Sequence, residues 1–299
     1  MKQKLSIKDN SKNSALISSG RLEDWKIGCF RILPSLHSSI FQIFRSSLKS
    51  FFQFQKRTEI IGAFFLFIFL FSSCGKENRF DCIKRTGEKT TDTRILPPFT
   101  KIYLKDNIDV FVKQGTEQEV KIEAGNNLVS LIKTEVIDGV LHIKNENKCN
   151  WARSYKKGKI SVYLTIPKLR YVSQFGSGEI KSIDTLSCDT IDILTGESGD
   201  VELYVNANVV FNHLHSTSDV TLHGKAPIQG IFHSGEGYLH CEDLQTDITW
   251  SHSVASGNEY LNAKNVLAVT IDWAGDIYYL GNPSIELKGT GKGKLIPNN

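Results

Sequence analysis

The chain has 299 residues, with 36 Lys and Arg against 32 Asp and Glu, a formal net charge of +4. Residues 1–73 hold 11 basic and 4 acidic residues, a net of +7, which leaves −3 for the rest of the chain. Because the basic excess is confined to the first quarter, the composition excludes a general role in nucleic-acid binding by phosphate neutralisation.

A short apolar run, residues 60–71, follows Lys56 and Arg57. It is too short to span a bilayer as a helix, which takes about 20 residues. A basic flank, an apolar core and a small-residue exit are the parts of a signal peptide. Residues 72–74, Ser-Ser-Cys, resemble a lipobox, although Phe71 stands where Leu is usual. We therefore expect residues 1–73 to be removed and Cys74 to carry lipid; the alternative is a buried helix of a cytosolic domain.

The first 47 residues do not fit a signal peptide, which normally begins shortly before its basic flank. We expect them to be an extension outside the protein, with Leu48 read as an alternative start. Gly75 follows the lipidated cysteine, and a residue other than Asp there favours the outer membrane, facing the periplasm or the cell surface. Residues 74–94 are polar and predict a tether. Residues 95–299 then form one domain.

Six cysteines are present, one of them in the leader. With Cys74 lipidated, four remain. Cys82 and Cys149 lie in polar, loop-like surroundings in a compartment where disulfides persist, so we expect them to pair. Cys188 and Cys241 lie in the repeats described below; pairing and burial as small side chains both stay open for them.

Residues 95–170 predict a section of short strands. Apolar and polar residues alternate in short runs bounded by Gly, Asn and Asp, which indicates strands with one buried face. Asp138-Gly139 predicts a tight hairpin, and residues 128–133 predict a short helix. The runs that predict strands are residues 101–104, 108–112, 120–123, 140–143 and 160–166.

An internal repeat occupies residues 171–299. A corner of Gly or Ser, then Gly, then an acidic residue or Asn recurs at intervals of about 18 to 21 residues. Such a period predicts a β-solenoid, in which each coil adds a layer to a shared core. We expect Gly to accept unusual φ there and Asp or Asn to bond its own downstream backbone. An antiparallel sandwich is the alternative, but it needs no fixed corner. The fold class is therefore all-β: a right-handed β-helix or β-solenoid preceded by a short-stranded β section.

These corners, such as residues 176–180 (GSGEI) and 197–201 (ESGDV), together with residues 99–115 and the block 149–155 (CNWARSY), resemble a known family. It is the domain called putative auto-transporter adhesin, head GIN domain, and the resemblance covers residues 95–295. It implies a β-helical fold on secreted or surface lipoproteins and no established reaction. Ser218 replaces the expected Gly before Asp219, and residues 236–237 lack the acidic residue in register, so distorted corners are expected there.

Three histidines recur once per coil. His215, His233 and His252 each precede a Ser and are spaced 18 and 19 residues apart. Stacking would place them about 4.8 Å apart, close enough to share a metal. Their alternation with apolar neighbours favours a structural ladder that points inward. We therefore expect no metal and no other cofactor.

The corner carboxylates invite a calcium or acid–base interpretation, but a turn role already explains each of them. The sequence has no Gly-x-Ser-x-Gly elbow between a strand and a helix, no Walker loop and no dinucleotide fingerprint. We expect no catalytic residue. The carboxylates in question are Glu179, Asp200, Asp219 and Asp276.

Aromatic residues are the stronger functional lead, because flat amphipathic rings suit a carbohydrate- or protein-binding face. Filling the core or the ends of the solenoid is the alternative, and adjacent Tyr278 and Tyr279 point to opposite faces. We expect a non-enzymatic cell-envelope lipoprotein, tethered to the membrane through Cys74, that binds a glycan or an envelope protein and no nucleic acid. A polysaccharide-acting enzyme and a purely structural component are the alternatives. The aromatic candidates are Trp151, Tyr155, Trp250, Trp273, Tyr278 and Tyr279.

Overall fold

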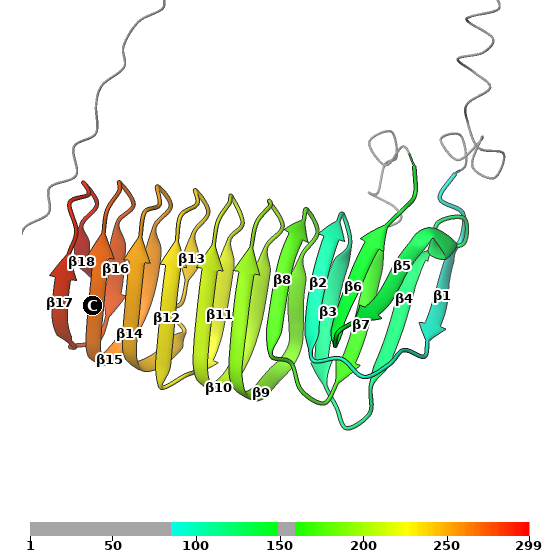
Figure 1. Ribbon diagram of the computed structural model, residues 1–299, viewed down its shortest axis with the longest axis horizontal. Helices are drawn as coiled ribbons and strands as arrows, with labels where there is room; N and C mark the ends of the chain where they lie inside the picture. Colours follow the sequence, from blue (N-terminus) through cyan, green and yellow to red (C-terminus); the bar gives the residue numbers. More distant parts are fainter. Residues whose placement is uncertain (1–84, 149–158, 299) are drawn as a thin grey trace, which may run out of the picture. The chain divides into compact units, whose positions relative to one another are not determined.

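The computed structural model describes residues 85–148 and 159–298, which are almost entirely β-structure (Figure 1). The strands of the N-terminal part are β1 (Lys89–Arg94), β2 (Lys101–Asp106), β3 (Asp109–Gln114), β4 (Glu119–Gly125), β5 (Ile132–Ile137), β6 (Val140–Asn145) and β7 (Ser161–Ile166), with the 3-10 helix η2 (Val129–Leu131) between β4 and β5. They are followed by β8 (Tyr171–Gly176), β9 (Ile180–Thr195), β10 (Val201–Leu214), β11 (Val220–Lys225), β12 (Ile228–His233), β13 (Leu239–His240), β14 (Leu244–Ser253), β15 (Glu259–Ile271), β16 (Ile277–Leu280), β17 (Ser284–Lys288) and β18 (Leu295–Pro297).

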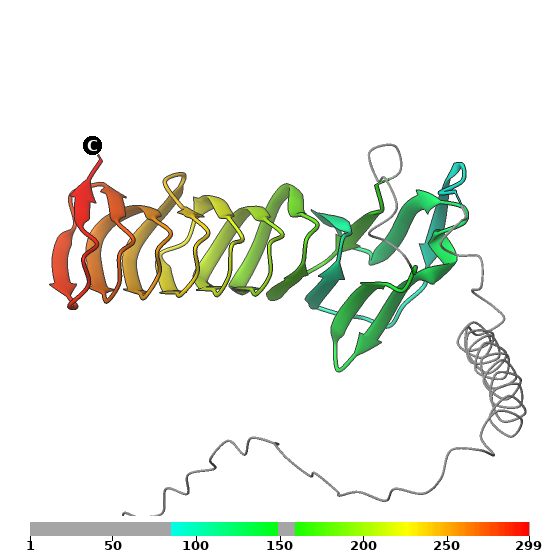
Figure 2. The same ribbon diagram turned by 90° about the horizontal axis from the view of Figure 1, so that it is seen from above.

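From β8 onward each coil lies parallel on the coil before it, so the predicted β-solenoid is confirmed (Figures 1 and 2). Face A consists of β8, the C-terminal halves of β9 and β10, β12, the C-terminal halves of β14 and β15, and β17. Face B consists of the N-terminal parts of β9 and β10, then β11, β13, the start of β15, β16 and β18. The strands β9, β10 and β15 are long because each runs from face B to face A without a break.

The N-terminal part joins the same stack in an order that differs from the sequence. The strand β2 lies between β6 and β8 on face A, and β3 lies between β7 and β9 on face B, with all four pairings parallel. The first coil of the chain is therefore inserted between a later coil and the β8–β9 coil. Antiparallel strands cover this end of the stack: β5 on β6, β4 on β7, and β1 on β4.

Local predictions within residues 95–170 are confirmed, but the predicted tether 74–94 is wrong at its end, because residues 89–94 form β1 and pair with β4. The five predicted strand runs coincide with β2, β3, β4, β6 and β7, and η2 lies inside the predicted short helix. Asp138 and Gly139 take φ of 49° and 73° and join β5 to β6, with Ile137 opposite Val140. Positive φ at both central residues is what the tightest right-twisted hairpin requires.

Gly289 has the expected positive φ, 110°, but the other corner glycines have a different cause. Gly257 and Gly275 do not have positive φ. A Cβ on Gly257 would instead overlap the carbonyl oxygen of Gly237, and one on Gly275 would overlap the carbonyl oxygen of Gly257. Glycine is required because the backbone of one coil lies directly against the backbone of the coil before it.

The corner carboxylates also act differently from the prediction, which gave each a bond to its own downstream backbone. Asp219 Oδ1 accepts a 2.7 Å hydrogen bond from the Tyr238 N–H, one coil further on. Asp276 Oδ1 accepts the Lys294 N–H at 2.8 Å in the same way. The corner at Ser218, where distortion was expected, is also joined to the coil before it, because Ser218 Oγ donates a 2.6 Å hydrogen bond to the Glu197 carbonyl. The corners are thus joined from coil to coil.

Side chains alternate between core and surface, and one inward column contains a carboxylate. Glu259 is fully buried there; Ser251 Oγ donates a 2.6 Å hydrogen bond to its Oε2. Nδ1 of the equally buried His233 lies 3.3 Å from Oε1, a close polar contact without hydrogen-bond alignment. A carboxylate needs such partners because burial removes its hydration. The column consists of Ile180, Val201, Val220, Leu239, Glu259 and Ile277.

We predict that Gly257→Ala lowers the free energy of unfolding by about 1–3 kcal/mol, the usual cost of forcing extra volume into a packed site. The new methyl group must displace the backbone of the neighbouring coil. Urea unfolding followed by circular dichroism measures the change. Ser256→Ala, at an exposed position in the same corner, is the control; equal stability of the two variants would contradict the close-approach explanation.

We predict that Glu259→Ala lowers the free energy of unfolding by about 3–5 kcal/mol, because it removes one member of a buried polar pair and leaves His233 and Ser251 without it. The matched control is Glu236→Ala, whose side chain is exposed at a corner and whose effect should stay within about 0.5 kcal/mol. The denaturant midpoints of both variants, measured side by side, test this prediction. A small loss of stability in Glu259→Ala would mean that the Glu259–His233 contact contributes little.

Candidate functional site

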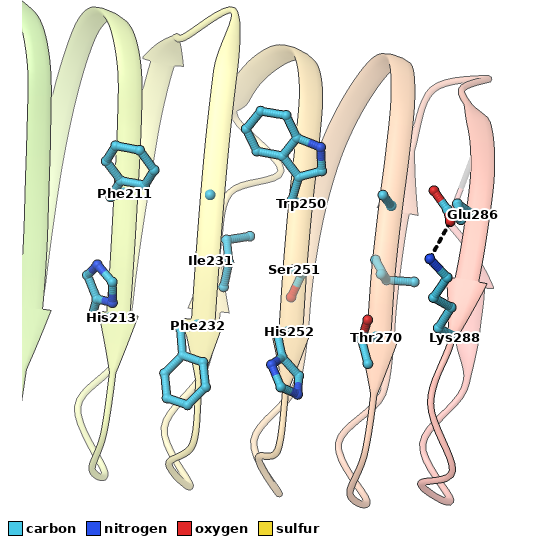
Figure 3. A pocket seen from close by; sticks show the side chains of 13 residues that line it. Phe211, His213, Ile231, Phe232, Trp250, Ser251, His252, Thr270, Glu286 and Lys288 are labelled. Carbon is cyan, nitrogen blue, oxygen red and sulfur yellow. Dashed lines mark ion pairs between the residues drawn. The ribbon is translucent and has the colours of Figure 1, made fainter. Parts of the chain in front are cut away.

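A shallow groove of about 480 Å³ lies on the outer surface of face A, across β10, β12, β14, β15 and β17 (Figure 3). We call it the aromatic groove. Ile231, Ser251 and Val269 form its floor, and strand register sorts the other lining residues into two rows, each with one residue per coil. The first row is Phe211, Gly230, Trp250, Ala268 and Glu286. The second row is His213, Phe232, His252, Thr270 and Lys288.

The first row is hollow because large and small side chains alternate along it. Trp250 stands between Gly230 and Ala268, and its side chain is 46% exposed. Phe211 leans over Gly230, where a Cβ would lie 2.8 Å from its Cδ1, and is 39% exposed. No ring of the described residues stacks on the Trp250 indole. The alternation therefore leaves aromatic faces open to a ligand.

Face B shows the contrasting arrangement. Tyr260 stacks between His240 and Tyr278, with ring centroids 4.9 Å and 5.0 Å away and interplanar angles of 3° and 10°. These rings cover one another and present mainly their edges. The face B ladder thus stabilises adjacent coils, and it offers less aromatic face to a ligand than the aromatic groove does.

Charged and polar groups surround the aromatic groove. His213 Nε2 lies 3.5 Å from Asp192 Oδ1, and His252 Nε2 lies 3.1 Å from Asp272 Oδ2. Partial burial raises the pKa of Asp192, with His213 opposing the shift. The Thr290 N–H, and after it the His252 side chain, lower the pKa of Asp272. These carboxylates and imidazoles can accept and donate hydrogen bonds to a hydroxylated ligand.

At the far end of the groove, Lys288 Nζ lies 2.6 Å from Glu286 Oε1. This hydrogen bond lowers the pKa of Glu286. Both side chains of the pair are exposed to solvent, so the ion pair contributes little to the stability of the fold. Lys288 and Glu286 line the groove itself, and the carboxylates of Asp192 and Asp272 lie beside it, against His213 and His252.

The predicted histidine column is not formed. His252 is in register with Phe232, whereas His233 is in register with Leu214 and Ser253. His233 is buried, and His215 and His252 point outward, with His215 Nδ1 2.8 Å from Ser234 Oγ. Across residues 85–148 and 159–298, no cluster of three or more His, Cys, Asp or Glu could hold a metal. The three candidates therefore lie in different environments and do not converge.

The other predicted residues divide between surface and core. Trp250 lines the aromatic groove, Trp273 is 60% exposed outside it, and Tyr279 packs partly on the core. Cys188 and Cys241 are free, and burial raises the pKa of both thiols. Outside the described residues lie Cys74, Cys82, Cys149, Trp151 and Tyr155, so the expected lipidation and disulfide stay predictions.

Sequence reasoning missed Phe211, His213 and Phe232. Phe232 lies one coil before His252, and Phe211 and His213 lie two coils before Trp250 and His252. Aligning the coils on their corners would have placed these side chains in common rows. The two small residues between the rings, Gly230 and Ala268, would then have marked the hollow.

No helix within the described ranges is long and apolar enough to cross a membrane. A comparison with curated proteins gives no match. Several solved structures are similar in fold. A putative adhesin from Bacteroides fragilis NCTC 9343 is 24% identical, with a TM-score of 0.64 over 70% of this chain and 97% of that chain.

Two structures come from Parabacteroides distasonis ATCC 8503. One, named a putative adhesin, is 18% identical with a TM-score of 0.56 over 71% of this chain and 97% of that one. The other, named a putative lipid binding protein, is 18% identical with a TM-score of 0.55 over 70% and 97%. A family model described as putative auto-transporter adhesin, head GIN domain, matches residues 98–283. The chain belongs to the putative auto-transporter adhesin, head GIN domain family.

Proposed function

We propose that this protein is a non-enzymatic cell-envelope lipoprotein whose solenoid binds carbohydrate in the aromatic groove. The observation that carries the proposal is the pair of exposed rings, Phe211 and Trp250, set two coils apart with only Gly230 between them. Two strand spacings amount to about 9.6 Å. A glycan lying along the solenoid axis could therefore place its apolar C–H faces on both rings at once.

The rim supports a hydroxylated ligand. Carboxylates and imidazoles at Asp192, His213, His252 and Asp272 flank the rings, and they can bond sugar hydroxyls as donors or acceptors. With three carboxylates to one lysine around the groove, an acidic polysaccharide would meet repulsion. A neutral glycan suits this balance of charge best.

The corner carboxylates argue against the enzyme alternative. Glycoside hydrolysis needs two carboxyl groups that face the same bond. Here Asp200, Asp219 and Asp276 each accept a backbone N–H from the next coil. They are therefore engaged in joining the coils, and their recurrence follows from the repeat. Membership of an adhesin-like family also supports a binding role rather than an enzymatic one.

The leader supports the proposed cell-envelope location. The apolar run 60–71 and the Ser-Ser-Cys exit at residues 72–74 support lipidation of Cys74, and the polar residues after it would separate the solenoid from the membrane surface. A tethered, rigid stack would then present face A to ligands outside the cytoplasm.

We predict that Trp250→Ala weakens glycan binding at least about 10-fold, a loss of about 1.4 kcal/mol, because the indole supplies the largest exposed ring of the groove. A glycan array identifies a bound neutral oligosaccharide, and calorimetry gives its affinity for each variant. Trp273→Ala, which removes an exposed indole outside the groove, should bind as the native protein does. Equal losses in the two variants, or no glycan above background, would overturn the carbohydrate proposal.

We predict that intact-mass analysis of the membrane fraction finds a chain that begins at a diacylated Cys74. Cys74→Ser should then leave the protein unlipidated and shift it out of the detergent-extracted fraction. A mature chain that retains residues before Cys74 would contradict the lipoprotein assignment, whatever the glycan measurements show.

A further inference from the structure

The coil formed by β17 and β18 leaves core positions open at one end of the stack. Ile285 is in register with the buried Leu267, yet its side chain is 45% exposed. Leu287 is in register with the buried Val269 and is 56% exposed. Both continue inward-facing columns of face A, so they extend the core to a surface that no other described strand covers (Figure 1).

The two ends of the stack differ in this respect. At the N-terminal end, the antiparallel strands β5, β4 and β1 follow the outermost coil. At the other end, β17 pairs with β15 on one side, and no strand of the described residues lies on its other side. Free backbone N–H and C=O groups beside exposed apolar side chains form a template for another strand. Solenoids normally need a polar cap at such an end.

Of the two strands at this end, β17 is the one suited to pairing. The strand β18 contains Pro297, which has no N–H to donate to a ladder. The strand β17, Ser-Ile-Glu-Leu-Lys, contains no proline and is exposed at every position. A partner strand would therefore be added on face A.

The charges of β17 match a second copy of the same strand. If two copies of β17 pair antiparallel about Leu287, Glu286 lies opposite the partner's Lys288, and Lys288 lies opposite the partner's Glu286. Opposite charges directly across a sheet are favourable and like charges are not. Shifting the centre to Glu286 would keep the inward and outward faces but set that carboxylate against its own copy. The charge pattern thus selects one register.

We propose that the β17 edge binds the β17 edge of a second copy of this chain, antiparallel and centred on Leu287. The two Leu287 side chains then cover each other's open core position. The existing Lys288–Glu286 contact lies within one exposed strand. Replacing it with two cross-strand pairs therefore loses little stabilisation. Face A becomes continuous across the two-fold axis, and both aromatic grooves lie on the same side of the joined sheet.

Charge reversal tests this pairing. The full chain, purified in detergent, is analysed by sedimentation velocity over a series of concentrations, with circular dichroism confirming that each variant is folded. The native chain should form dimers. Glu286→Lys alone and Lys288→Glu alone should each weaken dimerisation at least about 10-fold, because each sets like charges opposite one another.

Two restorations make the test specific. The double variant Glu286→Lys/Lys288→Glu should dimerise as the native chain does, and an equimolar mixture of the two single variants should form mixed dimers. A native chain that stays monomeric overturns the proposal. So does a single reversal that dimerises normally, or a double variant that is not restored, since either result excludes this register. Glycan binding by a monomeric chain would leave the proposed function standing and remove only the pairing.

Discussion

Contact between the backbones of successive coils at the glycine corners is the constraint on which the rest of the structure depends. At Gly257 and Gly275 no side chain fits, because the carbonyl oxygen of the preceding coil occupies the position of a Cβ. Beside these glycines, Asn258 and Asp276 accept backbone N–H groups from the following coil. Steric exclusion and hydrogen bonding together hold each coil in one register on the next.

Because the register is fixed, side chains at equivalent positions of successive coils form rows. The chemistry of each row depends on which residues are in register. On face B, rings coincide at Tyr260 and Tyr278, and they stack into a ladder that stabilises the coils. On face A, Gly230 and Ala268 coincide with Trp250, and a hollow results. The same backbone therefore supports a structural ladder on one face and a candidate binding surface on the other.

Register also explains the polar group in the core and the open end. Glu259 occupies an aliphatic column because its coil follows the same spacing as the others, and Ser251 and His233 supply its partners. Ile285 and Leu287 continue inward columns with no further described coil to cover them. In both cases position in the stack, rather than residue type, determines how each side chain is surrounded.

The sequence by itself determined the solenoid, its period, the strands of the N-terminal part and the Asp138-Gly139 hairpin, because these follow from local alternation, turn chemistry and a repeated corner. Only the tertiary structure decided that β2 and β3 are inserted between later strands, and that His233 points inward while His252 points outward. Alternation gives the side of a strand that a residue occupies, but small shifts in coil length decide which residues meet. The aromatic groove depends on the register that places Trp250 between Gly230 and Ala268.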